Sequence, residues 1–438
     1  MTIYQHSEHE RLTPNNDHFP SRAPFDTETL LEDSAARWRI VPNNAENHAA
    51  LMDAQTIEQI ACFQSNIENF IGTVKVPVGL AGPLRVNGVF AQGDYSIPLA
   101  TTEAALVASY HRGAQLISEV GGCSAMLLDE RVGRAPGFAF RTIDECSRFL
   151  NWVYEQWDIL QLEASRTTRY GKLIDMQATI EGNHLYLHFN FTTADAAGQN
   201  MVTIATEAIC SYLLQHCPIQ PQYHFLEANF SGDKKAAAQS LQRGRGKRVS
   251  AEVLIPAELV HERLHTSPQR MADFCRMGTL GAVLSGTIGT QGHFANGLAA
   301  LYIACGQDAA CVAESAVGVT RFELTQDGSL YAAVTLPNLI VGTIGGGTGL
   351  PSQHACLDIL KLTGPGNAQA LAEVCAGLCL AGEISLVAAL CADHFARAHK
   401  RLARDHFSIL KRVEKGNSCR LQRGKYTSQT QKDQVDMQ

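Results

Sequence analysis

The spacing of apolar and polar positions divides the chain into helical and extended stretches. Helical spacing runs through residues 27–66, in ETLLEDSAARWRIV and then NHAALMDAQTIEQIACFQS, and through TTEAALVASYHRGAQLISEVGG at 101–122, which ends on a glycine pair. Between them, VKVPVGLAGPLRVNG at 74–88 combines valines with turn glycines and predicts strands joined in a hairpin. Residues 1–26 are polar, contain three prolines and predict a loose arm.

Residues 134–225 predict a separate α/β unit. DECSRFLNWVYEQWDILQLEAS has the spacing of one amphipathic helix, GKLIDMQATIEGNHLYLHFNFTTA predicts two strands with a turn at EGN, and NMVTIATEAICSYLLQHC predicts a second helix. This order of elements is typical of a split β–α–β sandwich. From residue 250 on, long Ala/Leu/Gly helices are expected to alternate with glycine-rich turns, and after about residue 405 the basic, polar chain predicts a flexible tail.

Composition narrows the class of protein. A chain of 438 residues is expected to form two or three domains, and its net charge of −7 argues against a surface built for nucleic acid or anionic lipid. The 13 cysteines form no CxxC pair and several lie in apolar helical runs, so they predict reduced core residues and neither a disulfide framework nor a metal site. Since no signal region or uncharged apolar run of ~18 residues is seen, we expect a soluble, cytoplasmic protein.

Three charged residues stand out against apolar surroundings. Asp308 lies in YIACGQDAACV at 302–312, where a buried carboxylate would be costly, so it either faces solvent at a helix end or has a cationic partner. Lys234, in SGDKKAAAQS, is either part of a solvated charge triplet or a held cation that can stabilise an oxyanion. Glu103, expected in the first turn of an apolar helix, is either a capping residue or a general acid whose pKa is raised by burial.

Two glycine segments and two histidines each allow two interpretations. DAAGQNM at 195–201 follows a strand and opens a helix, where Asp195 is either an ordinary N-cap or part of a cofactor turn. GTIGGGTG at 342–349 is either a tight turn or a backbone surface for a pyrophosphate or nicotinamide. His394 and His399, in ADHFARAHKRLAR, are either surface residues of a basic helix or proton donors near neutral pH.

These segments occur together in one order along the chain. They include ENFIG, PVGLAGPL, ATTEAALVAS, DAAGQNM, GDKKAAA, RGRGK, YIACGQDAA, GTIGGGTG and GLCLAGEISLVAALCADH. Over about residues 60–404 the chain therefore resembles the 3-hydroxy-3-methylglutaryl-CoA (HMG-CoA) reductase family, in its eukaryote-type class and without the membrane region of animal members.

The resemblance implies an α+β fold, with a large domain built around a long central helix and an inserted, ferredoxin-like NADPH-binding domain. The expected boundaries are an N-terminal arm and small helical region at 1–66, the large catalytic domain at 67–133 and 226–404, the small domain at 134–225, and a flexible tail at 405–438. Family members form homodimers or homotetramers with active sites at the subunit interface, and we expect the same here. Nucleic acid and membrane are not expected partners.

The family reduces the thioester HMG-CoA to the alcohol mevalonate with two NADPH, in two hydride transfers. By resemblance, Lys234 is the cation on the reacting oxygen, and Asp308 is its buried, hydrogen-bonded partner. Glu103 is the proton donor to that oxygen, with an acidity coupled to the other two. His399 protonates the leaving CoA thiolate, whereas His394 matches no family motif.

Binding residues also follow from the resemblance. The substrate's HMG group is expected to contact Arg134, Asn229, Lys235, His293, Asn296, Arg276 and Glu227. The cofactor is expected to contact Arg169, Asp195, Gly198, Asn200, Met201, Gly345, Gly346 and Thr348. Arg169 matches a basic residue near the ribose 2′-phosphate, which favours NADPH over NADH.

The chain departs from the family pattern at several positions. Phe70 stands for a proline, and Ala197 and Gln199 stand for two methionines beside the nicotinamide. Glu227 replaces a serine that contacts substrate and Arg276 replaces a lysine of the same pocket, so we expect these two side chains to pair.

Three alternatives to HMG-CoA reduction remain from the sequence. Glu227 beside an anionic acyl group keeps open the same four-electron reduction on another 3-hydroxyacyl thioester. A non-catalytic relative that binds a CoA ester or NADPH is disfavoured because all four catalytic positions are present. Oxidation of mevalonate with NAD is disfavoured by Arg169 and the eukaryote-type motifs.

Overall fold

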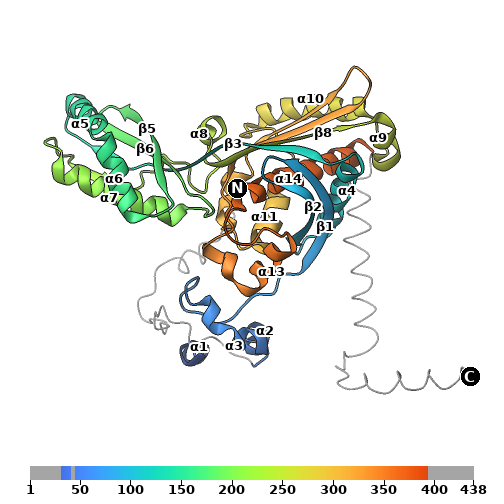
Figure 1. The fold of residues 1–438 in the computed structure, drawn as a ribbon, viewed down its shortest axis with the longest axis horizontal. Coiled ribbons are helices and arrows are strands. Elements are labelled where there is room, and N and C mark those ends of the chain that lie inside the picture. The colour runs from blue at the N-terminus through green and yellow to red at the C-terminus, as the bar shows by residue number, and fades with distance from the viewer. Residues whose placement is uncertain (1–30, 41–44, 393–438) are drawn as a thin grey trace, which may run out of the picture.

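The computed structural model describes residues 31–40 and 45–392, whose arrangement is shown in Figure 1. The expected arm at 1–26 and tail at 405–438 lie outside the described residues, as do His394 and His399. The described chain forms a large unit, a smaller unit that projects from one end of it, and a group of short N-terminal helices at the bottom of the view (Figure 1).

Short helices replace the long helical stretches expected between residues 27 and 66. They are α1 (Leu31–Trp38), α2 (Ala45–Leu51), α3 (Ala54–Glu58) and the 3₁₀ turn η2 (Ile60–Phe63). The side chain of Asp53 interrupts the pattern, because it accepts a hydrogen bond from the Thr56 amide at 2.9 Å and so begins a new helix. Phe70 is buried and stacks on Phe63, which ties the following segment to these helices.

The large unit is built on an extended sheet. The predicted hairpin is present as β1 (Val78–Gly88) and β2 (Gln92–Ala100), followed by α4 (Leu106–Glu119) and β3 (Cys123–Arg134). β1 pairs with β3 in parallel, and β3 continues antiparallel through β8 (Gly246–Ile255) and β10 (Leu330–Leu339) to β9 (Val319–Leu324). The glycine pair predicted to end α4 does so, since Gly121 and Gly122 both have positive φ.

The expectation of helices and turns alone after residue 250 was wrong for β8, β9 and β10. Burial alternates along β8 and β10, as it does in a strand with one face against the core. The small alanines and serines in GKRVSAEVLI and LYAAVTLPNL hid that period of two, because they read equally well as helix formers.

A long apolar helix, α14 (Ala368–Cys391), runs through the middle of the large unit. It packs against α4 and α11 (Phe294–Ala304) and against strands β1, β3, β8 and β10. By length and composition α14 is apolar enough to cross a membrane, but 83% of its most apolar window is buried inside the protein. This burial identifies it as the core helix on which the large unit is assembled.

The smaller unit joins the large one through β3. Its elements are β4 (Gly137–Ala139), α5 (Ile143–Glu155), α6 (Trp157–Thr167), β5 (Lys172–Glu181), β6 (His184–Thr192), α7 (Gln199–His216) and β7 (Tyr223–Phe225). The strands pair antiparallel in the order β7-β4-β6-β5, and β6 also pairs with the end of β3. The single amphipathic helix expected here is two helices, because the chain turns at Gln156.

The remaining elements connect these layers. They are α8 (Ala238–Arg243), α9 (Ala257–Leu264), α10 (Pro268–Ser285), η3 (Ala309–Cys311), α12 (Val312–Ser315), η4 (Gly346–Gly349) and α13 (Pro351–Ile359). The cysteines of the described chain form no disulfide with one another, and most are buried, as predicted for core residues. Those in the apolar helical runs, Cys305, Cys311, Cys375, Cys379 and Cys391, all lie in the core.

Candidate active site

Lys234 and Asp308 form an ion pair between two loops of the large unit. Lys234 Nζ lies 2.8 Å from Asp308 Oδ2, and this hydrogen bond is the main cause that raises the pKa of the Lys234 ammonium. The other oxygen of Asp308 accepts the Ala310 amide at 3.0 Å and begins η3. Asp308 therefore both lies at a helix end and has a cationic partner. Its expected burial was wrong, since the side chain of Asp308 is 41% exposed and that of Lys234 is 44% exposed.

A buried ion pair lies beneath Lys234, and sequence reasoning missed it. Arg245, 1% exposed, contacts Glu314 Oε2 at 2.5 Å and Asp233 Oδ1 at 3.0 Å. Its Nη2 also donates to the Gln199 side-chain oxygen at 2.7 Å. Arg245 belongs to the RGRGK motif, and Glu314 is an acid in an apolar run like Asp308, so the same desolvation argument would have found it.

Arg134, at the end of β3, is held by two carboxylates. Its Nη1 lies 3.0 Å from Asp233 Oδ2 and 3.3 Å from Glu227 Oε2. Arg134 is 6% exposed, and the other oxygen of Glu227 is buried without a hydrogen-bond partner among the described residues. Arg134, one of the cations expected to contact the HMG group, is thus already contacted by two carboxylates of the protein itself.

The expected pair between Arg276 and Glu227 is not formed within one chain. Arg276 is exposed on α10 and pairs instead with Asp273, one turn earlier on the same helix. The expected substrate residues Asn229 and Lys235 do lie near Arg134, on the loop that carries Glu227, Asp233 and Lys234. Lys235 Nζ donates to the Asp233 carbonyl at 3.0 Å, and Asn229 has a positive φ of 61°.

The two segments predicted to bind the cofactor lie side by side. The backbone oxygen of Asp195 accepts the amides of Thr343 and Ile344 at 2.9 and 3.3 Å, and Ala196 bridges to Ile344. The expectation that Asp195 caps α7 was wrong: the N-cap is Gly198, and the Asp195 carboxylate accepts the Ala368 amide at the start of α14.

These segments form a backbone cradle of the kind a dinucleotide requires. Gly198 has a φ of 82° and begins the 18-residue helix α7, and Gly345 and Gly346 also have positive φ. A Cβ added at Gly345 or Gly346 would meet nothing within 4 Å, so this surface is open. The Thr348 hydroxyl donates to the Gly345 carbonyl at 2.7 Å and closes the turn.

The side chains around the cradle are placed as a cofactor site would need. Asn200 is exposed on the first turn of α7. Met201 packs so closely on Gly171 that an added Cβ there would lie 2.6 Å from its sulfur. Arg169 is exposed on the same turn between α6 and β5. The residues present fit a phosphate-bearing dinucleotide.

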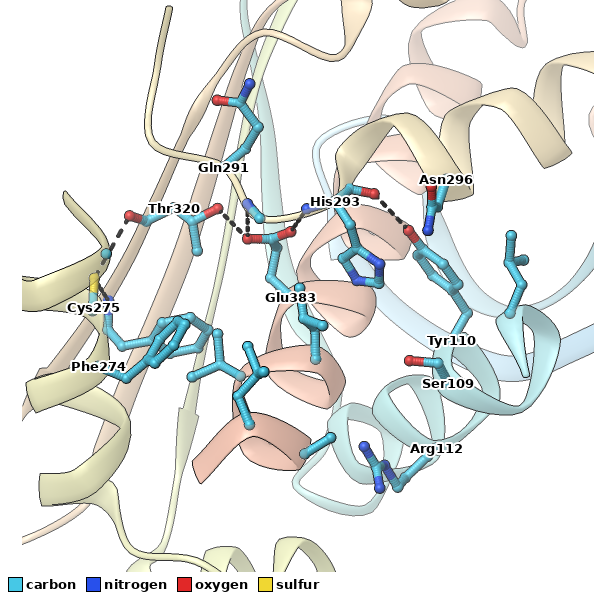
Figure 2. Close-up of a pocket in the computed structure, with 18 of the residues that line it drawn as sticks. Ser109, Tyr110, Arg112, Phe274, Cys275, Gln291, His293, Asn296, Thr320 and Glu383 are labelled. Atoms are coloured by element: carbon cyan, nitrogen blue, oxygen red, sulfur yellow. Dashed lines mark hydrogen bonds between the residues drawn. The ribbon is translucent and has the colours of Figure 1, made fainter. Parts of the chain in front are cut away.

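A cavity of about 770 Å³ lies between α4, α10, α11 and α14 (Figure 2). Glu383, 1% exposed, forms its wall and accepts the amides of Gly292 and His293 at 2.8 and 2.7 Å and the Thr320 hydroxyl at 2.8 Å. The expected substrate residues His293 and Asn296 line this cavity, as does Glu103. The Tyr110 hydroxyl donates to the His293 carbonyl at 3.1 Å.

Glu103 is not in the first turn of a helix. The helix α4 begins at Leu106, because Ala105 adopts a left-handed conformation with a φ of 73° and turns the chain. Glu103 is therefore exposed on the loop at the cavity. Its backbone amide donates a hydrogen bond to the Thr101 hydroxyl oxygen at 3.0 Å. The capping interpretation of Glu103 was wrong.

Within one chain, described residues of the expected catalytic and substrate sites, together with Asp233, form two groups. The lysine group comprises Arg134, Glu227, Asp233, Lys234 and Asp308, and the glutamate group comprises Glu103, His293 and Asn296. His293 precedes α11 and Asp308 follows it, so the length of this helix, roughly 16 Å, separates the groups. Among the described residues, no hydrogen bond or ion pair joins Glu103 to Lys234.

The family model described as hydroxymethylglutaryl-coenzyme A reductase matches residues 33–404. The 3-hydroxy-3-methylglutaryl-coenzyme A reductase of Pyrococcus horikoshii is 45% identical over 346 residues, 77% of this chain and 84% of that protein. The reductase 1 of Dictyostelium discoideum is 38% identical over 346 residues, covering 76% of this chain and 61% of that protein.

Solved structures share the fold. The class II 3-hydroxy-3-methylglutaryl-CoA reductase of Streptococcus pneumoniae, solved with NADPH in open conformations, superposes with a TM-score of 0.60. The match covers 79% of this chain and 95% of that one, at 20% sequence identity. This likeness supports the mixed α/β architecture described above.

Proposed function

Since the chain belongs to the hydroxymethylglutaryl-coenzyme A reductase family, we propose that it reduces HMG-CoA to mevalonate and coenzyme A with NADPH. The observation that carries the proposal is the Lys234–Asp308 ion pair, which holds a cation next to the cofactor cradle. Gln199, the first residue of α7, contacts both Arg245 and Cys311 and so joins the cradle to the loops of this pair.

The residues have distinct roles in this reaction. NADPH, when bound, would supply one hydride to the thioester carbon in the first step and a second hydride to the same carbon, by then an aldehyde, in the second step. Lys234 stabilises the oxyanion that develops on the substrate oxygen, and Asp308 keeps Lys234 protonated. In the first step the oxyanion re-forms its C=O bond as the C–S bond breaks, which gives an aldehyde and a coenzyme A thiolate, and the thiolate takes a proton from His399. In the second step the alkoxide of mevalonate takes its proton from Glu103.

We further propose that two copies of the chain assemble each active site. The glutamate group and the lysine group are separated within one chain, and a second copy would bring Glu103 to Lys234. Helix α10, which lines the Glu103 cavity, carries an exposed apolar face of Met277, Leu280, Val283 and Leu284, which are 66–87% exposed. A second copy would bury this exposed apolar face, so the face supports a homodimer, or a dimer of such dimers.

The class and the domain boundaries are part of the same proposal. Identity to the Dictyostelium reductase is 38% and to the class II enzyme 20%, which supports the eukaryote-type class. The strand order β7-β4-β6-β5 with helices α5, α6 and α7 supports a ferredoxin-like NADPH-binding domain at 134–225 inside a large domain at 67–133 and 226–404.

The contact between Glu227 and Arg134 favours a second candidate substrate. Glu227 lies 3.3 Å from Arg134 and presents a negative charge where the HMG carboxylate would bind. The same reduction of another 3-hydroxyacyl thioester, without a terminal carboxylate, would avoid that repulsion.

The test is turnover by purified protein. HMG-CoA should be converted to mevalonate with two NADPH consumed for each mevalonate formed, and Lys234→Ala should remove this activity while NADPH binding remains. A folded protein that binds NADPH but leaves HMG-CoA unchanged, while reducing an acyl thioester without the carboxylate, would replace HMG-CoA by the second substrate.

A further inference from the structure

A fully buried ion pair supports the backbone of the loop that carries Lys234. Arg245 lies between α8 and β8, Glu314 lies in the short helix α12, and the two side chains are 1% and 0% exposed. Buried charges of this kind destabilise a protein unless each has a close partner, so a pair kept inside a site often serves its geometry. The contacts of Arg245 and Glu314 lead to residues on either side of Lys234.

Glu314 holds the main chain of Lys234 directly. Its Oε1 accepts the Lys234 amide at 3.1 Å, while Oε2 contacts Arg245. Lys234 has a φ of 55°, in the left-handed region where a residue with a side chain is strained unless its surroundings hold it. Glu314 stabilises this conformation, because its buried carboxylate accepts the Lys234 backbone amide.

Arg245 holds the residue before Lys234. Its guanidinium lies 3.0 Å from Asp233, whose other oxygen lies 3.0 Å from Arg134. It also donates to Gln199 at the start of α7. Charges therefore alternate through Glu314, Arg245, Asp233 and Arg134, and the Asp233–Lys234 turn is held from both sides.

We propose that Arg245 and Glu314 are a positioning pair that fixes the Asp233–Lys234 backbone so that the Lys234 ammonium stays on Asp308. Neither residue touches substrate in this account; both act through Lys234. The inference rests on the proposed function for its kinetic consequence, but the position and charge of Lys234 can be measured without any turnover.

The consequence is a change in the protonation of Lys234. The groups facing its ammonium are Asp308, then Cys311 and Asp233, and Asp308 is the main cause that raises its pKa. If the backbone loosens, the contact with Asp308 is lost for part of the time and the pKa of Lys234 falls. Lys234 then loses its proton at a lower pH than in the unaltered protein.

The test variant is Glu314→Gln, compared with Glu373→Gln. Glu373 is equally buried in α14 and accepts the amides of Val89, Phe90, Ala91 and Leu127, far along the fold from Lys234. Both substitutions take a carboxylate from buried donors, so both are expected to lower the melting temperature. Only Glu314→Gln is expected to change Lys234.

The primary readout is the pH dependence of Lys234 acetylation by a trace of acetic anhydride, measured by mass spectrometry. We expect the midpoint to fall by about one pH unit or more in Glu314→Gln and to stay in Glu373→Gln. At pH 7.5 we also expect kcat with HMG-CoA to fall ~10-fold or more, with the KM for NADPH unchanged. An unchanged midpoint in Glu314→Gln, or an equal shift in Glu373→Gln, overturns the inference.

A double variant covers the case in which Glu314→Gln does not fold. Arg245→Gln with Glu314→Gln leaves no unpaired charge between these two positions. The same fall in the acetylation midpoint is expected, and an unchanged midpoint again overturns the inference. If the unaltered protein shows no reduction of HMG-CoA, the proposed function fails, while the acetylation measurement still decides the role of the pair.

Discussion

Gln307 and Gly342 exchange two hydrogen bonds. The side-chain nitrogen of Gln307 donates to the Gly342 carbonyl at 2.9 Å, and the Gly342 amide donates to the Gln307 side-chain oxygen at 2.8 Å. Gly306 packs on the same loop, where an added Cβ would lie 2.3 Å from the Gly347 carbonyl oxygen. The residue next to Asp308 is thus fastened to the glycine loop of the cofactor cradle.

Gln307→Leu is predicted to weaken NADPH binding. The substitution keeps the volume but leaves the amide and carbonyl of Gly342 without their partner, so the glycine loop loses its fixed distance from Asp308. We expect the KM for NADPH to rise ~10-fold and kcat to fall as well. Steady-state kinetics at saturating HMG-CoA will measure both.

Gln220→Leu is the matched control for this prediction. Its side chain also donates to backbone carbonyls, those of Leu214 and Cys217, but it lies at the far end of α7. The KM for NADPH should stay within about twofold of the unaltered protein. Equal effects of the two substitutions would contradict a specific role for Gln307.

Glu227→Gln is predicted to tighten the binding of HMG-CoA. The change removes the negative charge 3.3 Å from Arg134 and leaves Asp233 as the one carboxylate that contacts this cation among the described residues, so the substrate carboxylate meets less repulsion. We expect the KM for HMG-CoA to fall by ~3- to 10-fold, with kcat little changed. A higher KM for HMG-CoA would contradict this prediction. It would mean that the Glu227 carboxylate itself binds the substrate, as it would if the substrate carried a hydrogen-bond donor next to Glu227.

Glu383→Gln is predicted to slow the reaction without affecting the cofactor. A carboxamide has one oxygen for the three donors that Glu383 accepts, so the His293 backbone or Thr320 loses its partner. Displacement of the cavity wall should lower kcat ~10-fold or more, while NADPH binding, followed by its fluorescence, stays unchanged. An unchanged kcat would contradict the assignment of this cavity to the active site.

Leu284→Arg is predicted to separate the copies. Leu284 is 87% exposed on α10, and an arginine there would place a charge in the proposed interface. We expect a monomer by light scattering, which still binds NADPH but has no reductase activity. Ile143→Arg, at an equally apolar exposed position on α5, should leave both the assembly and the activity intact. A fully active monomer would contradict the shared site.

The catalytic chemistry could be predicted from sequence where one residue type at one position implies it. The family resemblance predicted the pairing of Asp308 with Lys234, and the two side chains are paired. The two glycine segments expected to bind the cofactor also lie side by side. The positions of Glu103 and Asp195 could not be predicted, because a single left-handed residue, Ala105, and a tertiary contact to α14 decide them. Local helix signals carry no information on either.

The strands and the buried network were hidden for a different reason. Alanine and serine in β8 and β10 satisfy helix and strand patterns alike, so only pairing with β3 decides between them. Arg245 and Glu314 are 69 positions apart, and their contact exists only after the sheet and α12 have formed. The expected Arg276–Glu227 pair is not formed within one chain, because Arg276 pairs with Asp273, one turn away on the same helix.

The most direct test of the account is complementation between two inactive variants. Lys234→Ala and Glu103→Gln should each be inactive, and mixing them under conditions that exchange subunits should restore activity. Half of the resulting dimers are mixed, and each has one intact site, so about a quarter of the unaltered activity is expected. If mixed dimers form, as measured by mass spectrometry, and no activity returns, the proposal that Glu103 of one copy serves Lys234 of another is contradicted.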